Sequence, residues 1–379
     1  MRLAVINLTA GDISGGYLKY LTNMLPRISS HTDIESILCA FPPSLKVPEN
    51  LNKISNLEIV SCKPYRPYNI LSDKKLKINL KNFKPDIIFI PIERYLKYNG
   101  VPVVTMLQNM EPFVARSNLN SIGINLKLSL RKYISQKALK KADGIISLSQ
   151  FVNSYITKEL KIPKSKSSII YHGIDQVISN KVSSPKILNN FSDEFIFTAG
   201  SIRPARGLED LIEALNILKE KDIRIKLIIA GDQSRESNKY LFYLKNMINN
   251  YNMSDMINFI GNINSNEMSW CYQNSKLFIM PSRVESFGMI AGEAMSNGCL
   301  CLSSLSPCLP EIFKDSAIYY EKKDFIDLAD KINYAINLND KIREKMSFRA
   351  INRAKQFSWD VCAEKTVSFL KEILQNSLT

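Results

Sequence analysis

The chain has 379 residues, 45% of them apolar, and its 50 Lys and Arg outnumber its 36 Asp and Glu to give a net charge of +14. This composition excludes a disordered or fibrous chain, and no apolar run approaches the roughly 20 residues of a membrane span. The length exceeds that of one ordinary core and predicts two domains of about 150 to 200 residues each.

The distribution of charge, cysteine and histidine narrows the class of protein further. Residues 1–180 contain 25 Lys and Arg and 12 Asp and Glu, so almost all of the positive excess lies in the first half. A basic half indicates either an anionic partner, such as a membrane, a nucleic acid or a phosphorylated substrate, or a solvated charged surface. Seven cysteines without paired C-x2-C spacing and only two histidines favour a reducing cytoplasm and argue against a metal site.

The first half alternates short apolar runs with longer amphipathic segments. We expect strands near residues 3–8, 34–40, 86–90, 101–107 and 144–148, and helices near 16–29, 73–82, 122–141 and 150–159. This alternation predicts a parallel sheet covered by helices, with a ligand at the carboxyl ends of its strands. Gly15 and Gly16 end the loop after the first strand, where they suit either close approach to an anionic ligand or a tight turn.

Glu111 and the segment 122–141 in the first half can each be interpreted in two ways. Glu111 follows the strand 101–107 closely and is either a functional carboxylate or a solvated loop residue. In the segment 122–141, Leu126, Leu130, Tyr133 and Ile134 recur at helical spacing while lysines and arginines occupy the other faces. This helix either rests on an anionic membrane surface or packs against the protein with a solvated basic face.

A polar stretch at residues 176–194 is expected to be a linker, after which the alternation restarts. We expect strands near 195–199, 226–230, 257–260, 277–280, 299–303 and 317–320, and helices near 207–220, 236–251, 265–273 and 289–297. The second half is therefore a second Rossmann-like domain. The loop after its first strand carries Arg203 and Arg206, whose guanidinium forks suit a diphosphate.

The segment 276–298 reads as a strand, a Pro281-Ser282 turn, a loop with Glu285, and a helix that ends at Gly298. Such a helix start directs backbone N–H groups toward a phosphate. The order of these residues resembles the donor-binding segment of the family 4 retaining glycosyltransferases, P-S-x-x-E-G-F-G-x-x-x-x-E-A-M-x-x-G, with Ser286 in place of one Gly. The loop 200–207 resembles their G-R-L-x-x-x-K-G, with Ser201 for Arg and Arg206 for Lys.

This resemblance implies an α/β fold of the GT-B type, two Rossmann-like doubly wound domains facing a central cleft. The acceptor-side domain would span 1–178 together with a returning helix near 360–379, and the donor-binding domain would span 194–359. Many family members have a His after the strand 101–107, and this chain has Gln108 or Asn109 there. These amides cannot act as acid or base near neutral pH, although they can hydrogen-bond sugar hydroxyls.

The resemblance also assigns roles to side chains. Glu285 would hold the hydroxyls of the donor sugar, Glu293 those of the ribose, and Arg206 with Arg203 would neutralise the diphosphate. The residues assigned to catalysis are Glu285, Arg206, Gln108 and Asn109. The residues assigned to binding the donor, a nucleotide-diphosphate sugar that serves as co-substrate without metal or other cofactor, are Gly15, Gly16, Ser201, Arg203, Arg206, Gly231, Asn262, Ile263, Ser286, Phe287, Gly288, Met289 and Glu293.

The implied function is that of a retaining hexosyltransferase acting on a glycan or lipid-linked acceptor in bacterial surface polysaccharide or lipopolysaccharide synthesis. We expect it in the cytoplasm, at the inner face of the plasma membrane through its basic half, and without a nucleic-acid partner. Two alternatives share the same loops: a non-catalytic GT-B partner subunit, favoured by the absent His, and a sugar-nucleotide epimerase. A glycoside hydrolase using Glu285 and Glu293 as its carboxyl pair is a third.

Overall fold

The computed structural model describes residues 1–9, 15–43, 47–64, 73–114, 117–176, 182–188, 191, 193–232 and 238–378. They form two compact units, each built on one parallel sheet. The first unit contains Met1–Met110, Leu130–Gly173 and the chain from Phe357 onward, and the second contains Glu111–Ser129 and Ile174–Gln356. The predicted pair of Rossmann-like domains is confirmed. The segment Glu111–Ser129 groups with the second unit, although it lies within the range 1–178 assigned to the first domain.

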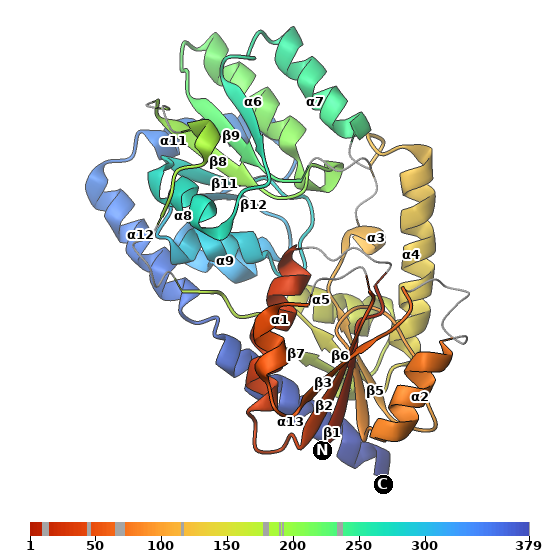
Figure 1. Ribbon diagram of the computed structural model, residues 1–379. Coiled ribbons are helices and arrows are strands. Elements are labelled where there is room, and N and C mark those ends of the chain that lie inside the picture. The colour runs from red at the N-terminus through yellow and green to blue at the C-terminus, as the bar shows by residue number, and fades with distance from the viewer. Residues whose placement is uncertain are drawn as a thin grey trace. The chain divides into compact units, whose positions relative to one another are not determined.

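The sheet of the first unit has the strand order β3-β2-β1-β4-β5-β6-β7 (Figure 1). Its strands are β1 (Arg2–Ile6), β2 (Ser36–Phe41), β3 (Leu57–Ser61), β4 (Ile87–Ile90), β5 (Val103–Leu107), β6 (Gly144–Ser147) and β7 (Ser167–Ile169). The central strands are buried along their length, because helices cover both faces of a parallel sheet. The edge strands β3 and β7, which the sequence analysis did not predict, are half-buried and carry polar residues.

Helices and short turns connect these strands. The helices of the first unit are α1 (Gly15–Ser29), α2 (Lys74–Phe83), α5 (Gln150–Ser154) and α13 (Trp359–Leu378), and its short turns are η1 (Glu49–Lys53), η3 (Tyr155–Glu159) and η4 (Lys164–Lys166). Asp73 caps α2 by accepting from the backbone N–H of Leu76, and Ser149 caps α5 by accepting from that of Val152. The helix α4 (Ile122–Lys141) contains the boundary between the two units.

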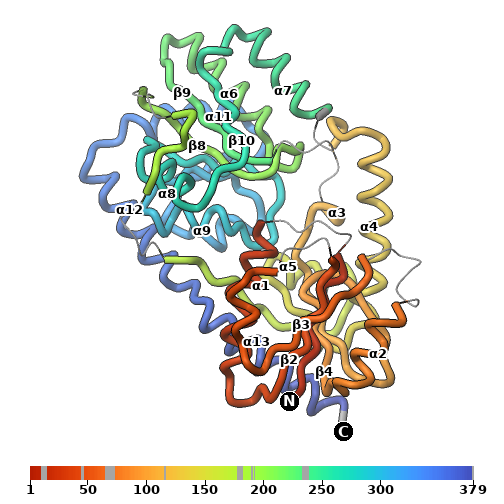
Figure 2. Tube along the Cα trace, viewed as in Figure 1, coloured from red at the N-terminus to blue at the C-terminus, as the bar shows by residue number. Residues whose placement is uncertain are grey.

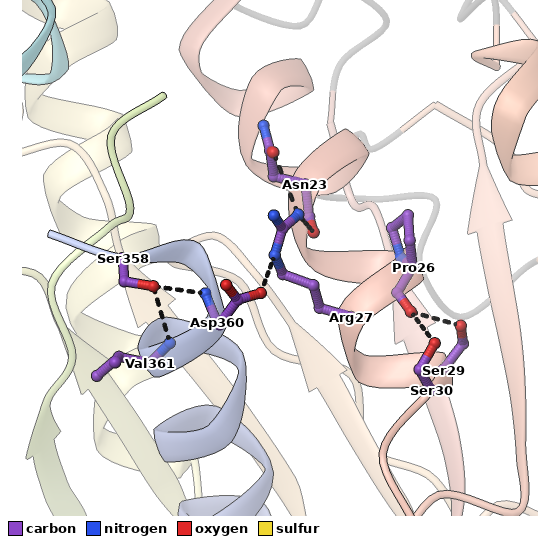
Figure 3. A network of polar contacts seen from close by, with 8 residues as sticks. All are labelled: Asn23, Pro26, Arg27, Ser29, Ser30, Ser358, Asp360 and Val361. Carbon is purple, nitrogen blue, oxygen red and sulfur yellow. Dashed lines mark hydrogen bonds and ion pairs between the residues drawn. The ribbon is translucent and has the colours of Figure 1, made fainter. Parts of the chain in front are cut away.

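The last helix, α13, packs beside α1 within the first unit (Figure 2). Arg27 Nε lies 2.7 Å from Asp360 Oδ1, and the hydroxyl of Ser358 accepts from the N–H groups of Asp360 and Val361 at 3.1 and 3.4 Å (Figure 3). The ion pair is largely exposed and contributes at most about 1 kcal/mol. Buried apolar side chains such as Leu370 therefore supply most of the attachment.

The segment that leaves β7 packs closely against the start of α13. A Cβ at Gly173 would lie 2.3 Å from the Trp359 ring and 2.4 Å from its backbone nitrogen, so only glycine fits. The neighbouring His172 is buried, with its ring centroid 4.8 Å from that of Tyr20 and 6.0 Å from that of Trp359. His172 is thus part of the core of the first unit.

The sheet of the second unit has the strand order β10-β9-β8-β11-β12-β13. Its strands are β8 (Phe195–Ala199), β9 (Lys226–Ala230), β10 (Ile257–Gly261), β11 (Leu277–Met280), β12 (Cys301–Ser304) and β13 (Ala317–Tyr320). Its helices are α3 (Glu111–Val114), α6 (Leu208–Glu220), α7 (Asn238–Asn250), α8 (Ser265–Asn274), α9 (Met289–Ser296), α10 (Leu309–Phe313), α11 (Phe325–Ile336) and α12 (Asp340–Ala354). Short turns are η5 (Lys186–Leu188), η6 (Pro204–Arg206) and η8 (Lys314–Ser316).

Two further observations concern the chain as a whole. None of the helices in the described ranges is both long enough and apolar enough to cross a bilayer. All seven cysteines are buried and unpaired, and burial raises the pKa of several of their thiols, as for Cys271 and Cys362, to about 12 in each case.

The buried His172 makes the stability of the first unit sensitive to acid. Burial lowers the pKa of His172 to about 3, whereas an unfolded histidine titrates near 6.5. Between these values the unfolded chain binds the extra proton, so stability falls as the pH drops below about 6.5. Between pH 6.5 and 4.5, the free energy of unfolding of the wild type should therefore fall by about 2 kcal/mol more than that of His172→Asn. Urea unfolding at the two pH values measures this difference. Equal losses in the two proteins would contradict this assignment.

Candidate functional site

The strand order of the second unit reverses between β8 and β11. Strands β9 and β10 lie on one side of β8, and β11, β12 and β13 lie on the other. The loops that follow β8 and β11 therefore diverge at the carboxyl edge of the sheet and leave a ligand position between them. Arg203 and Arg206 belong to the first of these loops, and Glu285 belongs to the second.

Arg206 joins the two loops. Its Nη1 forms an ion pair with Oε1 of Glu285 and donates to Oγ of Ser282 at 3.1 Å. The side chains of Arg206 and Glu285 are only 15% and 14% exposed. Burial lowers the pKa of Arg206 and the carboxylate of Glu285 opposes this shift, so the pair keeps the guanidinium charged.

Glycines clear the space next to this pair. A Cβ at Gly231, the residue after β9, would lie 1.8 Å from the carbonyl oxygen of Gly200, so a side chain there would displace the β8 loop. A Cβ at Gly200 would approach the Arg206 guanidinium carbon at 3.1 Å. The backbone of Gly200 is therefore packed against the Arg206 side chain, and that of Gly231 is packed against Gly200.

The loop between β11 and α9 is anchored by three hydrogen bonds to two other segments, the loop after β8 and the end of β12. Arg283 N donates to the carbonyl of Ala205 at 2.9 Å, which ties it to the β8 loop. The hydroxyls of Ser304 and Ser306 donate to the carbonyls of Ser282 and Arg283 at 2.6 and 2.9 Å. These contacts fix the backbone that carries Glu285 before any ligand binds.

A second charged cluster lies at the start of α6. Nη2 of Arg283 lies 2.7 Å from Oε1 of Glu209 and 2.8 Å from Oδ1 of Asp210, and both carboxylates are less than a tenth exposed. Tyr240 donates its hydroxyl to Glu209 and accepts from Leu208 N at 3.1 Å. Burial raises the pKa of both carboxyl groups, and Arg283 opposes that rise.

The remaining predicted donor residues follow the same edge. Glu293 lies half-buried on α9, where it accepts from the hydroxyl of Tyr272 at 3.4 Å. Ser286, Phe287 and Gly288 are buried just before α9, and Met289 begins that helix half-buried. Of the other predicted residues in the loops after β8 and β10, Ser201 and Ile263 are half-buried and Asn262 is exposed.

The first unit has a matching reversal between β1 and β4, with its own polar residues. Gln108 is half-buried after β5, and its N–H donates to Oε2 of Glu93 at 3.4 Å, while Asn109 beside it is also half-buried. Tyr17 donates its hydroxyl to the buried Asn7 at 2.6 Å. Burial raises the pKa of Glu93, and Arg94 opposes this.

The predicted glycines of this unit are at the start of α1. Gly15 and Gly16 are exposed, and a Cβ at Gly15 would meet no atom within 4 Å. The preceding loop residues Gly11 to Ser14 lie outside the described residues. Packing in the described chain therefore does not require glycine at position 15.

Sequence reasoning assigned no site role to several residues of these sites, namely Ser282, Arg283, Glu209, Asp210, Glu93 and Tyr17. The adjacent acids at the start of a helix that follows Gly207 are a local signal, because carboxylates there complement the helix dipole. Nothing in the local sequence indicates that Arg283 pairs with Glu209 and Asp210. Within the described residues, no group of three or more His, Cys, Asp or Glu side chains is arranged to hold a metal ion.

Comparisons with known proteins agree along most of the chain. The model "Glycosyltransferase Family 4" matches residues 16–176, and "Glycosyl transferases group 1" matches residues 180–354. An uncharacterised glycosyltransferase of Methanocaldococcus jannaschii is 28% identical over 246 residues, 64% of this chain and 63% of that protein. The O-antigen chain mannosyltransferase B of Escherichia coli is 23% identical over 311 residues, 80% of this chain and 79% of that protein.

Solved structures share the fold. A glycosyltransferase from Rickettsia africae has a TM-score of 0.74 at 20% identity and covers 99% of both chains. Anabaena HepE, solved with UDP and glucose, has a TM-score of 0.72 at 17% identity over 98% of this chain and 99% of that one. At these identities the likeness establishes architecture alone.

The Arg283 cluster predicts a stability effect. Arg283→Gln leaves Glu209 and Asp210 buried beside a neutral amide, and we expect the free energy of unfolding to fall by about 3 kcal/mol in urea titrations. The matched control is Arg349→Gln, because Arg349 pairs with the 73% exposed Asp315. Arg349→Gln should lower the free energy of unfolding by less than about 1 kcal/mol. Equal effects of the two substitutions would show that the cluster is not a buried ion pair in solution.

Proposed function

This chain belongs to the group 1 (family 4) glycosyltransferases and has their GT-B fold, and we propose that it is a retaining hexosyltransferase with a nucleotide-diphosphate sugar as donor. The observation that carries the proposal is the pairing of Arg206 with Glu285 across the switch point of the second sheet. A buried cation and a carboxylate at one ligand edge suit a substrate that carries both a diphosphate and hydroxyl groups.

The donor is assigned to the second unit. Arg206, with Arg203, neutralises the diphosphate, and the N–H groups of Phe287, Gly288 and Met289 at the start of α9 add to that field. Glu285 accepts hydrogen bonds from the sugar hydroxyls, and Glu293 accepts from the ribose. The proposal needs no metal ion, because guanidinium and backbone groups stabilise the charge that develops on the leaving group.

In the proposed transfer, the bond between the anomeric carbon and the diphosphate oxygen breaks while a bond forms from an acceptor hydroxyl oxygen to the same carbon. The hydroxyl proton passes to the leaving diphosphate, which is the base. Gln108 and Asn109 would then only hydrogen-bond hydroxyl groups, which amides can do without titrating. The absence of a His at this position is compatible with this scheme.

The acceptor is proposed to be a glycan or a lipid-linked sugar in the assembly of a surface polysaccharide or lipopolysaccharide. The E. coli relative named as an O-antigen chain mannosyltransferase supports this class of acceptor and a hexose donor. A non-catalytic partner subunit would bind donor without transfer, and an epimerase would convert the donor without an acceptor. Incubating the protein with donor, with and without an acceptor, therefore distinguishes a transferase from a non-catalytic subunit and from an epimerase.

A ligand screen followed by one substitution tests the proposal. A nucleoside diphosphate at 100 times its Kd should stabilise the protein by about 2.7 kcal/mol in thermal-shift assays. With the matching nucleotide sugar, Glu285→Gln should lower kcat at least about 100-fold, because one preorganised hydrogen-bonding group is lost from the sugar site. The product should retain the anomeric configuration of the donor, measured by NMR.

The control for this experiment is Glu344→Gln, since Glu344 is exposed on α12. It should keep the wild-type kcat, and circular dichroism should show both variants folded. Absence of any shift with all nucleoside diphosphates, or unchanged turnover in Glu285→Gln, would refute the assignment.

The helix α4 supports a cytoplasmic location at the membrane surface as part of this proposal. Leu128, Ser135 and Leu139 are buried on one side of it. The exposed large apolar side chains of this helix are Ile122, Leu126, Leu130 and Tyr133, at 82, 66, 55 and 54%. At 100° per residue these four share the side opposite the buried residues, so the apolar stripe faces outward.

Lysines continue this exposed stripe. Lys137 and Lys140 lie on the same side of α4 and are exposed, and Lys137 Nζ lies 4.3 Å from the centroid of the Tyr133 ring. Apolar side chains flanked by cations match a bilayer with anionic head groups, each surface cation contributing about 1 kcal/mol. We therefore propose an anionic membrane as the partner of α4.

Vesicle binding tests this surface. The wild type should sediment with vesicles of phosphatidylglycerol and phosphatidylcholine more than with phosphatidylcholine alone, and less at high salt. Leu126→Ser with Leu130→Ser should weaken binding at least about tenfold, because apolar burial is lost. Phe348→Ser is the control, since Phe348 is 68% exposed on α12 and should bind as the wild type does. Equal binding by all three proteins would contradict a role for α4.

A further inference from the structure

The two arginines of the β8 loop are both paired with carboxylates. Arg206 pairs with Glu285, as described, and Nη1 of Arg203 forms an ion pair with Oε2 of Glu111. Glu111 begins α3 and belongs to the segment Glu111–Ser129, which lies about 90 residues earlier in the chain but groups with the second unit. A carboxylate from a distant segment therefore occupies the loop that is assigned to the diphosphate.

The burial of the Arg203 pair is unequal. The side chain of Glu111 is 9% exposed, whereas that of Arg203 is 38% exposed. A carboxylate so far from water needs a cation, because an unpaired buried charge is strongly destabilising. Arg203, by contrast, keeps an open side from which a second anion can approach.

The charges of this cluster also balance without a ligand. Arg203 and Arg206 carry two positive charges, and Glu111 and Glu285 carry two negative charges. The field of Glu111 extends to Arg206, whose pKa it raises while Arg203 lowers it. An incoming diphosphate brings at least two further negative charges to the arginines, so it competes with the two carboxylates for the guanidinium N–H groups. Glu285 is assigned to the donor sugar, which leaves Glu111 as the group without a role in the bound state.

We propose that Glu111 is an internal anion that holds Arg203 in the donor-free protein, and that the diphosphate of the donor takes its place. Donor binding then frees the segment Glu111–Ser129 from Arg203. The inference rests on the proposed function, because it takes the ligand of Arg203 to be a diphosphate. It adds a residue that sets donor affinity and that lies outside the motifs described above.

Competition for Arg203 predicts that removing Glu111 tightens anion binding. In isothermal titration calorimetry with inorganic pyrophosphate, and with the nucleoside diphosphate found in the ligand screen, Glu111→Gln should bind about tenfold more tightly than the wild type. Arg203→Gln should bind about tenfold more weakly. In the Arg203→Gln background, Glu111→Gln should change affinity less than about twofold, because the competed cation is gone. Glu344→Gln is the control and should leave affinity unchanged.

Hydrogen exchange in the wild type provides a second measurement that needs no substitution. Saturating pyrophosphate should speed amide exchange in residues 117–129 while it slows exchange in residues 200–207. Unchanged or weaker binding by Glu111→Gln, or unchanged exchange in 117–129, would overturn the inference while the proposed function stands. If neither pyrophosphate nor any nucleoside diphosphate binds the wild type, the proposed function fails and the inference fails with it.

Discussion

The second unit depends on one electrostatic requirement, which is that a guanidinium withdrawn from water must have a counter-ion. Arg206 meets it with Glu285, and Ser282 adds a hydrogen bond. Because the two charged residues follow β8 and β11, their pairing fixes the loops on both sides of the switch point. The glycine at 231 serves the same arrangement, since a Cβ there would push the β8 loop away. A site formed in this way is organised before a ligand arrives, which lowers the cost of binding.

Glu285 and Glu293, which have seven residues between them, contact different partners. Glu285 is paired with a buried arginine, whereas Glu293 accepts from the tyrosine hydroxyl of Tyr272 on another helix. A glycosidase needs its two carboxyl groups on opposite sides of one bond. Different partners on a loop and on a helix instead suit contacts with separate parts of one long ligand, which is why the transferase assignment explains the pair better than a hydrolase does.

Sequence reasoning predicted the parts of the fold that local pattern determines. The strands at 195–199, 226–230, 277–280 and 317–320 have the predicted bounds, because buried parallel strands are continuous apolar runs between polar loops. The edge strands β3 and β7 lack such runs and were missed. The cluster of Arg283 with Glu209 and Asp210 was missed for another reason. Arg283 lies more than 70 residues from the two acids in the chain, and nothing in either local sequence indicates the other.

The segment from Glu111 through α4 shows where local pattern stops being informative. Helical periodicity places Leu126, Leu130 and Tyr133 on one face, but periodicity cannot tell which face packs, and in α4 the buried face is the other one. Local sequence is equally uninformative about Glu111. A carboxylate just after a strand is expected to be solvated, and only the pairing with the distant Arg203 explains why Glu111 is buried. Both outcomes follow from contacts with remote parts of the chain. One stretch therefore carries an outward apolar surface and a buried acid, the two features that connect this fold to a membrane and to its donor in the proposals above.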